Sequence, residues 1–222
     1  MYKRQPVVSG NVSLYNETKG QAIFPTPTVA VVGLIEDQTK TMTQGFKKSG
    51  HCIGLIGFTM EELGGSEYLK VLFDKNEGKP PVLDRKQEKH VQKFCLELIQ
   101  KGIIQSAHDC SEGGLVIAVA ESCFSSPEET FGETLELEST LRADALMFSE
   151  SQSRIVISFS KELKNQIENL ALSYPIDFSL IGKTGGSQFT VNINSQEYIK
   201  QDIGTIKEIW KTSLGCYAGQ TA

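Results

Sequence analysis

The residues with the greatest capacity for chemistry lie in one short turn, His108 to Glu112 (H-D-C-S-E), followed by two glycines and an apolar segment. The turn carries an imidazole, a thiol and two carboxylates. Backbone N–H groups at a helix start attract anions, and carboxylates bind hard cations, so the turn could hold either. The pattern fits equally well an ordinary connection between a strand and a helix, with Ser111 as the N-cap. The turn alone leaves both interpretations open.

Further oxygen ligands lie outside this turn. Glu150 adds a carboxylate, and Asn11 and Gln152 add amide oxygens. Together with Asp109 and Glu112 they suit Mg²⁺, an ion that usually arrives with nucleotide phosphates. The sequence contains no G-x-S-x-G, Walker A or G-x-G-x-x-G pattern. A hydrolase elbow and a standard nucleotide fold are therefore not indicated.

Cys110 and His108 are the two candidates for nucleophile and general acid or base. A small thiol beside a buried helix is more often a packing residue. A histidine in such a turn more often hydrogen-bonds the turn itself. The sequence favours these structural roles for both.

A polar segment, Ser149–Arg154 (S-E-S-Q-S-R), stands between two apolar segments. Buried polar groups without partners cost free energy, so this segment does not belong in a core. It either lines a cleft or forms a surface loop, and we expect the cleft. Leu63–Glu67 (L-G-G-S-E) is a second glycine turn, which could hold a phosphate or could simply start a helix capped by Ser66.

Composition excludes several classes of protein. The chain has 222 residues, enough for one large domain or a domain and a half, and its net charge of −5 comes without a basic block, which speaks against nucleic acid. It shows no apolar run long enough to cross a membrane and no signal peptide. Its five cysteines are scattered, which fits neither a disulfide framework nor a structural zinc site. We therefore expect a cytoplasmic protein.

The elements that must position these residues alternate irregularly between strand and helix, which predicts an α/β (α+β) fold, a mixed β-sheet with flanking helices. Strands are expected at Cys52–Gly57, Ile103–Ile104, Thr134–Glu138, Ile155–Phe159, Phe178–Gly182 and Gln188–Ile193. Helices are expected at Glu67–Phe73, Asp84–Lys101, from the glycines after Glu112, Lys161–Ser173 and Gln201–Leu214. Residues 183–187 resemble a hairpin loop, and Trp210 is expected on the buried side of the last helix.

The first forty residues do not make a domain of their own. Thr28–Ile35 (T-V-A-V-V-G-L-I) is apolar without alternation, which is typical of a strand covered on both faces. No helix accompanies it to provide that cover. We predict that residues 1–46 are the tail of a domain that begins upstream, and that residues 47–222 form an α/β domain.

Three stretches resemble one family. Pro6–Glu17 (P-V-V-S-G-N-V-S-L-Y-N-E), continued by Pro25–Asp37, is similar to the second half of the phosphoribosylformylglycinamidine synthases, ATP-dependent ligases of purine synthesis. His108–Leu115 (H-D-C-S-E-G-G-L) and Phe148–Arg154 match the same family at matching spacing. The first run is specific to these enzymes, whereas the second is shared more loosely across the aminoimidazole ribonucleotide synthetase superfamily. The resemblance covers essentially everything after residue 5.

The resemblance implies a C-terminal domain of the aminoimidazole ribonucleotide synthetase type, preceded by the remnant of the second ATP-binding-type domain. By motif, Gly10 would contact ATP, Asn11 would ligate Mg²⁺ and Ser13 would contact the ribonucleotide substrate. Asp109, Glu112, Glu150, Ser151 and Gln152 would face a second, pseudo-equivalent pocket that serves structure or auxiliary nucleotide binding.

The implied reaction converts formylglycinamide ribonucleotide and ammonia into the amidine. Its partners would be the missing N-terminal half and a glutaminase that supplies the ammonia. No catalytic residue is expected in this chain, because none of its histidines stands in the family's catalytic motif, so the chain alone should be inactive. The alternative is a non-catalytic module that binds a nucleotide or holds an assembly together. Another kinase or cyclase of the superfamily fits less well, because the Gly10–Glu17 run is specific.

Overall fold

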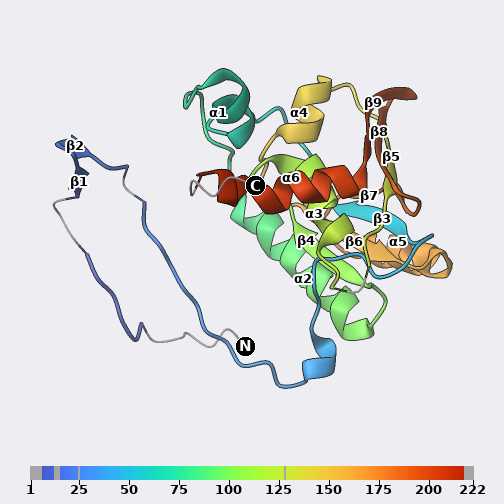
Figure 1. Ribbon diagram of the computed structural model, residues 1–222. Coiled ribbons are helices and arrows are strands. Elements are labelled where there is room, and N and C mark those ends of the chain that lie inside the picture. The colour runs from blue at the N-terminus through green and yellow to red at the C-terminus, as the bar shows by residue number, and fades with distance from the viewer. Residues whose placement is uncertain (1–6, 13–15, 25, 128, 218–222) are drawn as a thin grey trace. The chain divides into compact units, whose positions relative to one another are not determined.

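The computed structural model describes residues 7–12, 16–24, 26–127 and 129–217, with side chains given up to residue 213 (Figure 1). The chain divides into two compact units, Met1–Glu36 and Asp37–Ala222. Ser13, the predicted substrate contact, lies outside the described residues.

In its described residues, the first unit contains one antiparallel pair, β1 (Glu17–Thr18) and β2 (Gln21–Ala22), joined by a tight turn. The covered strand predicted at Thr28–Ile35 is not present in this chain, because the segment is assigned no strand and Leu34 is 91% exposed. A β-branched sequence favours a strand, but burial requires neighbours on both faces. In the described residues of this unit, Thr28–Ile35 stays exposed along its whole length.

The second unit is built on a seven-stranded mixed sheet with the order β4-β6-β3-β7-β5-β8-β9. Its strands are β3 (Cys52–Ile56), β4 (Ser106–Asp109), β5 (Glu133–Leu137), β6 (Ile155–Phe159), β7 (Phe178–Thr184), β8 (Gln188–Ile193) and β9 (Gln196–Asp202). Neighbours pair antiparallel except β5 and β8, which are parallel.

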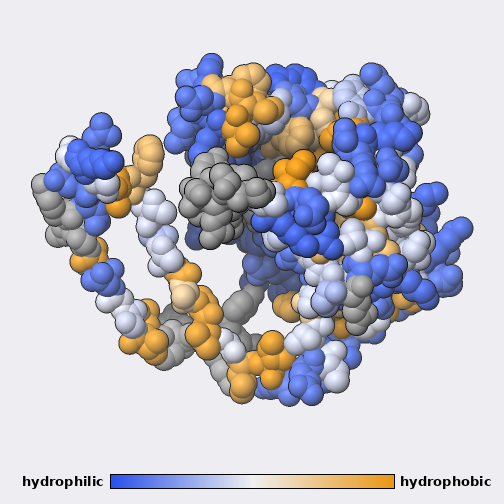
Figure 2. Space-filling view, viewed as in Figure 1, coloured by the Kyte–Doolittle hydropathy of each residue, from blue (hydrophilic) through white to orange (hydrophobic). Residues whose placement is uncertain are grey.

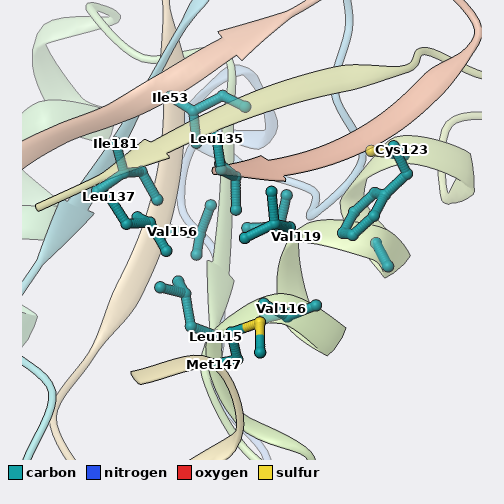
Figure 3. Close-up of a cluster of buried hydrophobic side chains, with 14 of the residues drawn as sticks. Ile53, Leu115, Val116, Val119, Cys123, Leu135, Leu137, Met147, Val156 and Ile181 are labelled. Atoms are coloured by element: carbon teal, nitrogen blue, oxygen red, sulfur yellow. The ribbon is translucent and has the colours of Figure 1, made fainter. Parts of the chain in front are cut away.

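Helices cover both faces of this sheet. The α-helices of this unit are α1 (Glu67–Phe73), α2 (Arg85–Lys101), α3 (Gly114–Phe124), α4 (Ala143–Phe148), α5 (Lys164–Ala171) and α6 (Ile203–Tyr217), with short 3-10 turns at Gln38–Lys40 and Lys161–Leu163. Of these, α1 has no buried residue and does not contribute to the core. One apolar cluster joins the sheet to α3, α4 and α6, and Figure 3 shows part of it. The other joins the sheet to α2 and α5. The predicted fold class, a mixed sheet with flanking helices, is confirmed.

The helix α2 shows how the local sequence defines an element. The Asp84 carboxylate accepts the N–H groups of Lys86 and Gln87, and the helix ends at Gly102 with φ +67°. Its buried stripe contains Val91, Phe94, Cys95 and Leu98, as the spacing predicts. These features fix the end of α2 just before β4, the strand that carries the candidate turn.

Three predictions about elements are wrong. Ile103 and Ile104 are buried in the α2-side core but lie in a loop, and the strand begins at Ser106, where the pairing with β6 starts. Residues 183–187 do not close a hairpin, because β5 inserts between β7 and β8 and pairs with both. Trp210 is 53% exposed rather than buried, although its ring contacts Phe124 and its indole N–H donates to Glu121.

One strand and one α-helix of the second unit were not predicted. The strand β9 is polar and almost wholly exposed, so it lacks the alternation that marks a half-buried strand. The helix α4 has only six residues, too few to show a helical period. Both depend on tertiary contacts.

Hydrophobic side chains also appear on the surface. Figure 2 shows a group of them over α1, where Val71, Leu72 and Phe73 are exposed. In the described part of the chain, no helix is long and apolar enough to span a bilayer.

Candidate functional site

The turn after β4 carries the first group of predicted site residues. The hydroxyl of Ser111 donates to the Asp109 carboxylate, and this bond holds the pKa of Asp109 below its ordinary value. The N-cap of α3 is Gly113, with φ +78° and no side-chain cap. The predicted cap at Ser111 is therefore wrong, because its hydroxyl is committed to Asp109.

Gly114 brings the start of α3 against the Ser149 loop. A Cβ at this position would lie 2.5 Å from the Ser149 carbonyl oxygen and 2.9 Å from the carbonyl carbon of Phe148. The residue also has φ +73°, which glycine adopts without strain. The second glycine of the motif is thus required for the contact between the two predicted site segments.

The buried side chain of Arg154 holds the polar loop in place through hydrogen bonds. Its side chain is only 2% exposed, yet it reaches no carboxylate in the described structure. The guanidinium donates to the carbonyls of Ser151 and Ser149 at 2.8 and 2.6 Å, and to the Thr59 hydroxyl at 2.9 Å. Burial lowers its pKa, but an arginine remains charged. This cation fixes the loop backbone and so fixes where Glu150 and Gln152 lie.

Glu150 links two helix starts. Its Oε1 accepts the Gly113 N–H at 2.8 Å, just before α3, and the Glu67 N–H at 2.9 Å, at the start of α1. Each helix leaves free N–H groups at its first turn, and a carboxylate is a strong partner for them. One oxygen of Glu150 is therefore committed to the backbone.

The second glycine turn, Leu63–Glu67, has its free backbone amides bound by side chains of the protein. Ser66 caps α1 by accepting the Leu69 N–H, as predicted, and Glu150 takes the Glu67 N–H. The amide that a phosphate would need is thus occupied. The geometry therefore supports a helix start capped by Ser66 rather than a phosphate site.

The turn after β4 and the loop before β6 enclose a cavity of about 310 Å³, which we call the Asp109–Arg154 cavity. It is lined by Glu88, Val91, Asp109, Cys110, Ser111, Glu112, Glu150, Gln152, Ser153, Arg154 and Ile155. The structure therefore brings together four of the five predicted pocket residues, and the polar loop lines a cleft as expected. Ser151 is fully buried behind it, where its hydroxyl bonds the backbone of Met60.

The lining charges suit a cation or a metal-bound ligand better than a bare anion. Four carboxylates face one buried guanidinium. No group of three or more His, Cys, Asp or Glu side chains converges as a metal site among the described residues. Asp109 and Glu112 could each offer an oxygen to Mg²⁺, but a bound ion would need ligands from elsewhere.

His108 and Cys110 have structural roles. The Nε2 of His108 lies 2.9 Å from the Glu121 carboxylate, which also accepts the Trp210 indole N–H. Burial lowers the pKa of His108, but the bond and charge of Glu121 outweigh it, so the net pKa is raised. Burial raises the pKa of the Cys110 thiol to about 11, which leaves almost no thiolate nucleophile near neutral pH.

Gly10 and Asn11 lie in the first unit, and both are exposed. Nothing lies within 4 Å of the position where a Cβ of Gly10 would stand. The segment is open and could be approached by a ligand or another polypeptide.

Arg154, Gly114 and Glu121 were not predicted as organising residues. The sequence signal for Arg154 was its place at the end of a polar segment between apolar ones. The signal for Gly114 was the glycine pair itself. Nothing local marks Glu121, because its contact with His108 depends on the packing of α3 against β4.

The family model of "AIR synthase related protein, C-terminal domain" matches residues 48–194. The chain belongs to this family. The matched region begins just before β3 and ends just after β8, so it contains both segments of the Asp109–Arg154 cavity.

Relatives in this family include three subunits named phosphoribosylformylglycinamidine synthase subunit PurL. The protein of Caldanaerobacter subterraneus subsp. tengcongensis is 41% identical over 93% of this chain. Those of Alkaliphilus metalliredigens and Moorella thermoacetica are each 42% identical over 95%. The chain spans 28% of the length of each.

Solved structures share the fold. PurL of Thermotoga maritima complexed with FGAR has a TM-score of 0.66 at 18% identity, over 76% of this chain and 30% of that one. The same protein complexed with ATP has a TM-score of 0.61 at 17% identity, over 75% and 27%. The structure of PurLQS from the same organism gives 0.61 at 17%, over 75% and 27%. This chain therefore has the fold of the AIR synthase related C-terminal domain.

Proposed function

We propose that this chain is the C-terminal part of an ATP-dependent ligase that converts formylglycinamide ribonucleotide into the corresponding amidine in purine synthesis. The observation that carries the proposal is the 41–42% identity to PurL subunits over 93–95% of the chain. The match extends through both segments that line the Asp109–Arg154 cavity.

In the proposed reaction, ATP activates the amide oxygen of the substrate, and ammonia displaces it to give an amidine, ADP and phosphate. A glutaminase partner supplies the ammonia, and the parent enzyme works in the cytoplasm. Mg²⁺ would neutralise the charge of the nucleotide phosphates. The contribution of this chain is to bind and position, because it contains no residue to which we assign a catalytic step.

The first unit supplies one wall of the ATP site in this proposal. Gly10 lets a phosphate approach the backbone, Asn11 offers an amide oxygen to Mg²⁺, and Ser13 bonds the substrate. The openness of Gly10 and Asn11 supports this assignment. The exposed apolar segment Thr28–Ile35 supports the further proposal that residues 1–46 complete an ATP-type domain whose other strands lie outside this chain.

The Asp109–Arg154 cavity has a different place in the proposal. It is the pseudo-equivalent pocket, and its role is to support structure or to hold an auxiliary nucleotide. The commitment of Glu150 to two backbone amides supports the structural part of that role. Asp109, Glu112 and Gln152 retain exposed polar groups that a bound nucleotide with its cation could use.

A trans-complementation assay tests the proposal. The chain is incubated with ATP, formylglycinamide ribonucleotide and ammonia, first alone and then with the missing part of the parent protein. We expect amidine product only in the second case. Product from the chain alone would refute the proposed division of the active site. Tight ATP binding by the chain alone, without product in either case, would favour the nucleotide-binding module.

A pair of variants in the full-length parent tests Asn11. Asn11→Ala removes the proposed Mg²⁺ ligand, and we expect turnover at limiting Mg²⁺ to fall by at least about tenfold. Asn11→Asp keeps an oxygen ligand and should retain more activity at the same Mg²⁺ concentration. Equal losses in both variants would contradict metal ligation by this residue.

A further inference from the structure

The sheet separates at one end between β5 and β7. These strands pair from Glu133 and Thr184 to Leu135 and Gly182, and the pairing stops there. Beyond this point β5 continues along β8 to Leu137, while β7 runs along β3 as far as Phe178. The two strands therefore diverge, and their facing edges are not paired with each other.

A cavity of about 390 Å³ opens where they diverge. It is lined by Leu55, Gly57, Phe58, Thr59, Leu115, Glu136, Leu137, Glu138, Ser139, Leu141, Leu146, Asp177, Phe178, Ser179, Leu180 and Ile181. Its volume is within the range of small-molecule pockets, about 300–1,000 Å³. It shares no lining residue with the Asp109–Arg154 cavity.

The floor of this cavity is apolar and belongs to the buried core. Leu115, Leu137, Leu146 and Ile181 belong to the buried cluster between the sheet and α3. Figure 3 shows Leu137 and Ile181 on the sheet side of that cluster and Leu115 on the helix side. A hydrophobic group placed here would extend the core and lose contact with water.

The rim is acidic. Glu136, Glu138 and Asp177 are exposed at the mouth, and none of the described residues that line the cavity is basic. Phe58 adds an aromatic ring that is 46% exposed. Carboxylates and an aromatic face both attract an organic cation. Glu136 also holds the Asn192 amide, so Glu138 and Asp177 are the freer carboxylates.

We propose that this cavity binds a small organic cation, a protonated amine attached to an apolar body. The apolar body would lie on the leucine and isoleucine floor. The ammonium group would lie at the mouth between Glu138 and Asp177, where an N–H can also donate to backbone carbonyls at the diverging strand edges. The proposal does not rest on the ATP site, because none of the residues that line this cavity lies in the Gly10–Ser13 segment.

Titration of the full chain with phenethylamine tests the proposal. Two probes of similar size serve as controls, neutral 2-phenylethanol and anionic 3-phenylpropionate. We expect phenethylamine alone to shift the backbone amide NMR signals of Glu138, Ser179 and Leu180 in a saturable way. Equal shifts with all three probes would mean that the cavity binds the apolar group regardless of charge, which would overturn the proposal. The absence of shifts at millimolar phenethylamine would overturn it as well.

Charge-neutralising variants test the proposed contacts. Glu138→Gln and Asp177→Asn should each weaken phenethylamine binding about threefold, because each removes one partly solvated charge contact. Glu208→Gln on α6 removes the same charge outside the cavity and should leave the affinity unchanged. If all three variants weakened binding equally, the affinity would depend only on the net charge of the chain, and the proposed binding site would be contradicted. None of these outcomes bears on the ligase proposal, because the assay contains no ATP or ribonucleotide.

Discussion

A single buried cation, Arg154, determines the shape of the candidate pocket. A guanidinium removed from water is stable only when its N–H groups are hydrogen-bonded. Here the partners are two carbonyls and one hydroxyl rather than a carboxylate. The Arg154 side chain thus holds the backbone of the loop that it ends, and Glu150, Gln152 and Ser153 line the cavity.

Replacing Arg154 tests this role. Arg154→Met leaves two buried carbonyls without donors, and we expect it to lower the free energy of unfolding by about 3 kcal/mol. Arg154→Lys keeps the charge but loses the fork of donors, so an intermediate loss is expected. Urea denaturation of the full chain measures both. A loss below about 1 kcal/mol for Arg154→Met would contradict the role.

The His108–Glu121 pair gives a pH dependence. The pKa of His108 is raised above 6.5, so its stabilising effect is fully present below that pH and is lost as the pH rises through the folded pKa. The pKa of Glu121 is lowered from 4.5, because of its hydrogen bond to His108, so its effect is lost only in more acidic solution. The pair stabilises most between these two ordinary values.

The variant His108→Gln should therefore destabilise the chain more at about pH 5.5 than at about pH 8.5. The measurement is the difference in thermal midpoint between variant and wild type at each pH. His90→Gln is the control, because His90 is half-buried on α2 and has no bond to a carboxylate in the described structure. If the difference in thermal midpoint were the same at both pH values, His108 would contribute by packing alone.

At the scale of elements, the contact between α3 and the Ser149 loop depends on the missing Cβ of Gly114. Gly114→Ala would bring a methyl group within 2.5 Å of the Ser149 oxygen, at a φ of +73°. Gly186 is a matched control, since it has the same φ of +73° and nothing within 4 Å. The two substitutions share the conformational cost but only the first creates a clash.

We expect Gly186→Ala to cost about 1 kcal/mol and Gly114→Ala at least about 2 kcal/mol more. Chemical denaturation of the full chain gives both values. Similar costs would mean that the loop moves aside, and that the close approach is not required for the fold. The amide NMR signals of Glu150 and Gln152 should shift in the Gly114 variant but not in the Gly186 variant.

At the scale of the whole molecule, the boundary between the two units can be tested. The second compact unit begins at Asp37, and Phe46 is fully buried in its core. The backbone N–H of Phe46 also donates to the Ser122 carbonyl on α3. The segment just before β3 therefore contributes packing to the α/β unit.

Two truncations separate the contributions. A chain of residues 37–222 should unfold cooperatively with its core intact. A chain of residues 47–222 should be less stable by about 3 kcal/mol, because it loses a fully buried phenylalanine. Thermal unfolding followed by circular dichroism measures both. Equal midpoints would show that Phe46 is not part of the cooperative core.

The sequence by itself determined the mixed sheet, the amphipathic helix α2 with both its ends, and the two polar segments of the cavity. These follow from local chemistry, because an N-cap, a glycine stop and a 3.6-residue period act within one element. The sequence motifs also carried the family resemblance, since they can be compared position by position.

Only the tertiary structure decided what those residues do. The insertion of β5 between β7 and β8 depends on strand pairing across distant parts of the chain, which no local pattern encodes. The same is true of Glu150, whose carboxylate reaches amides from two helices, and of Arg154, whose burial is set by packing. Hydrogen bonds and close packing act over a few ångströms in space, whatever the separation in sequence, so their partners emerge only when the chain is folded.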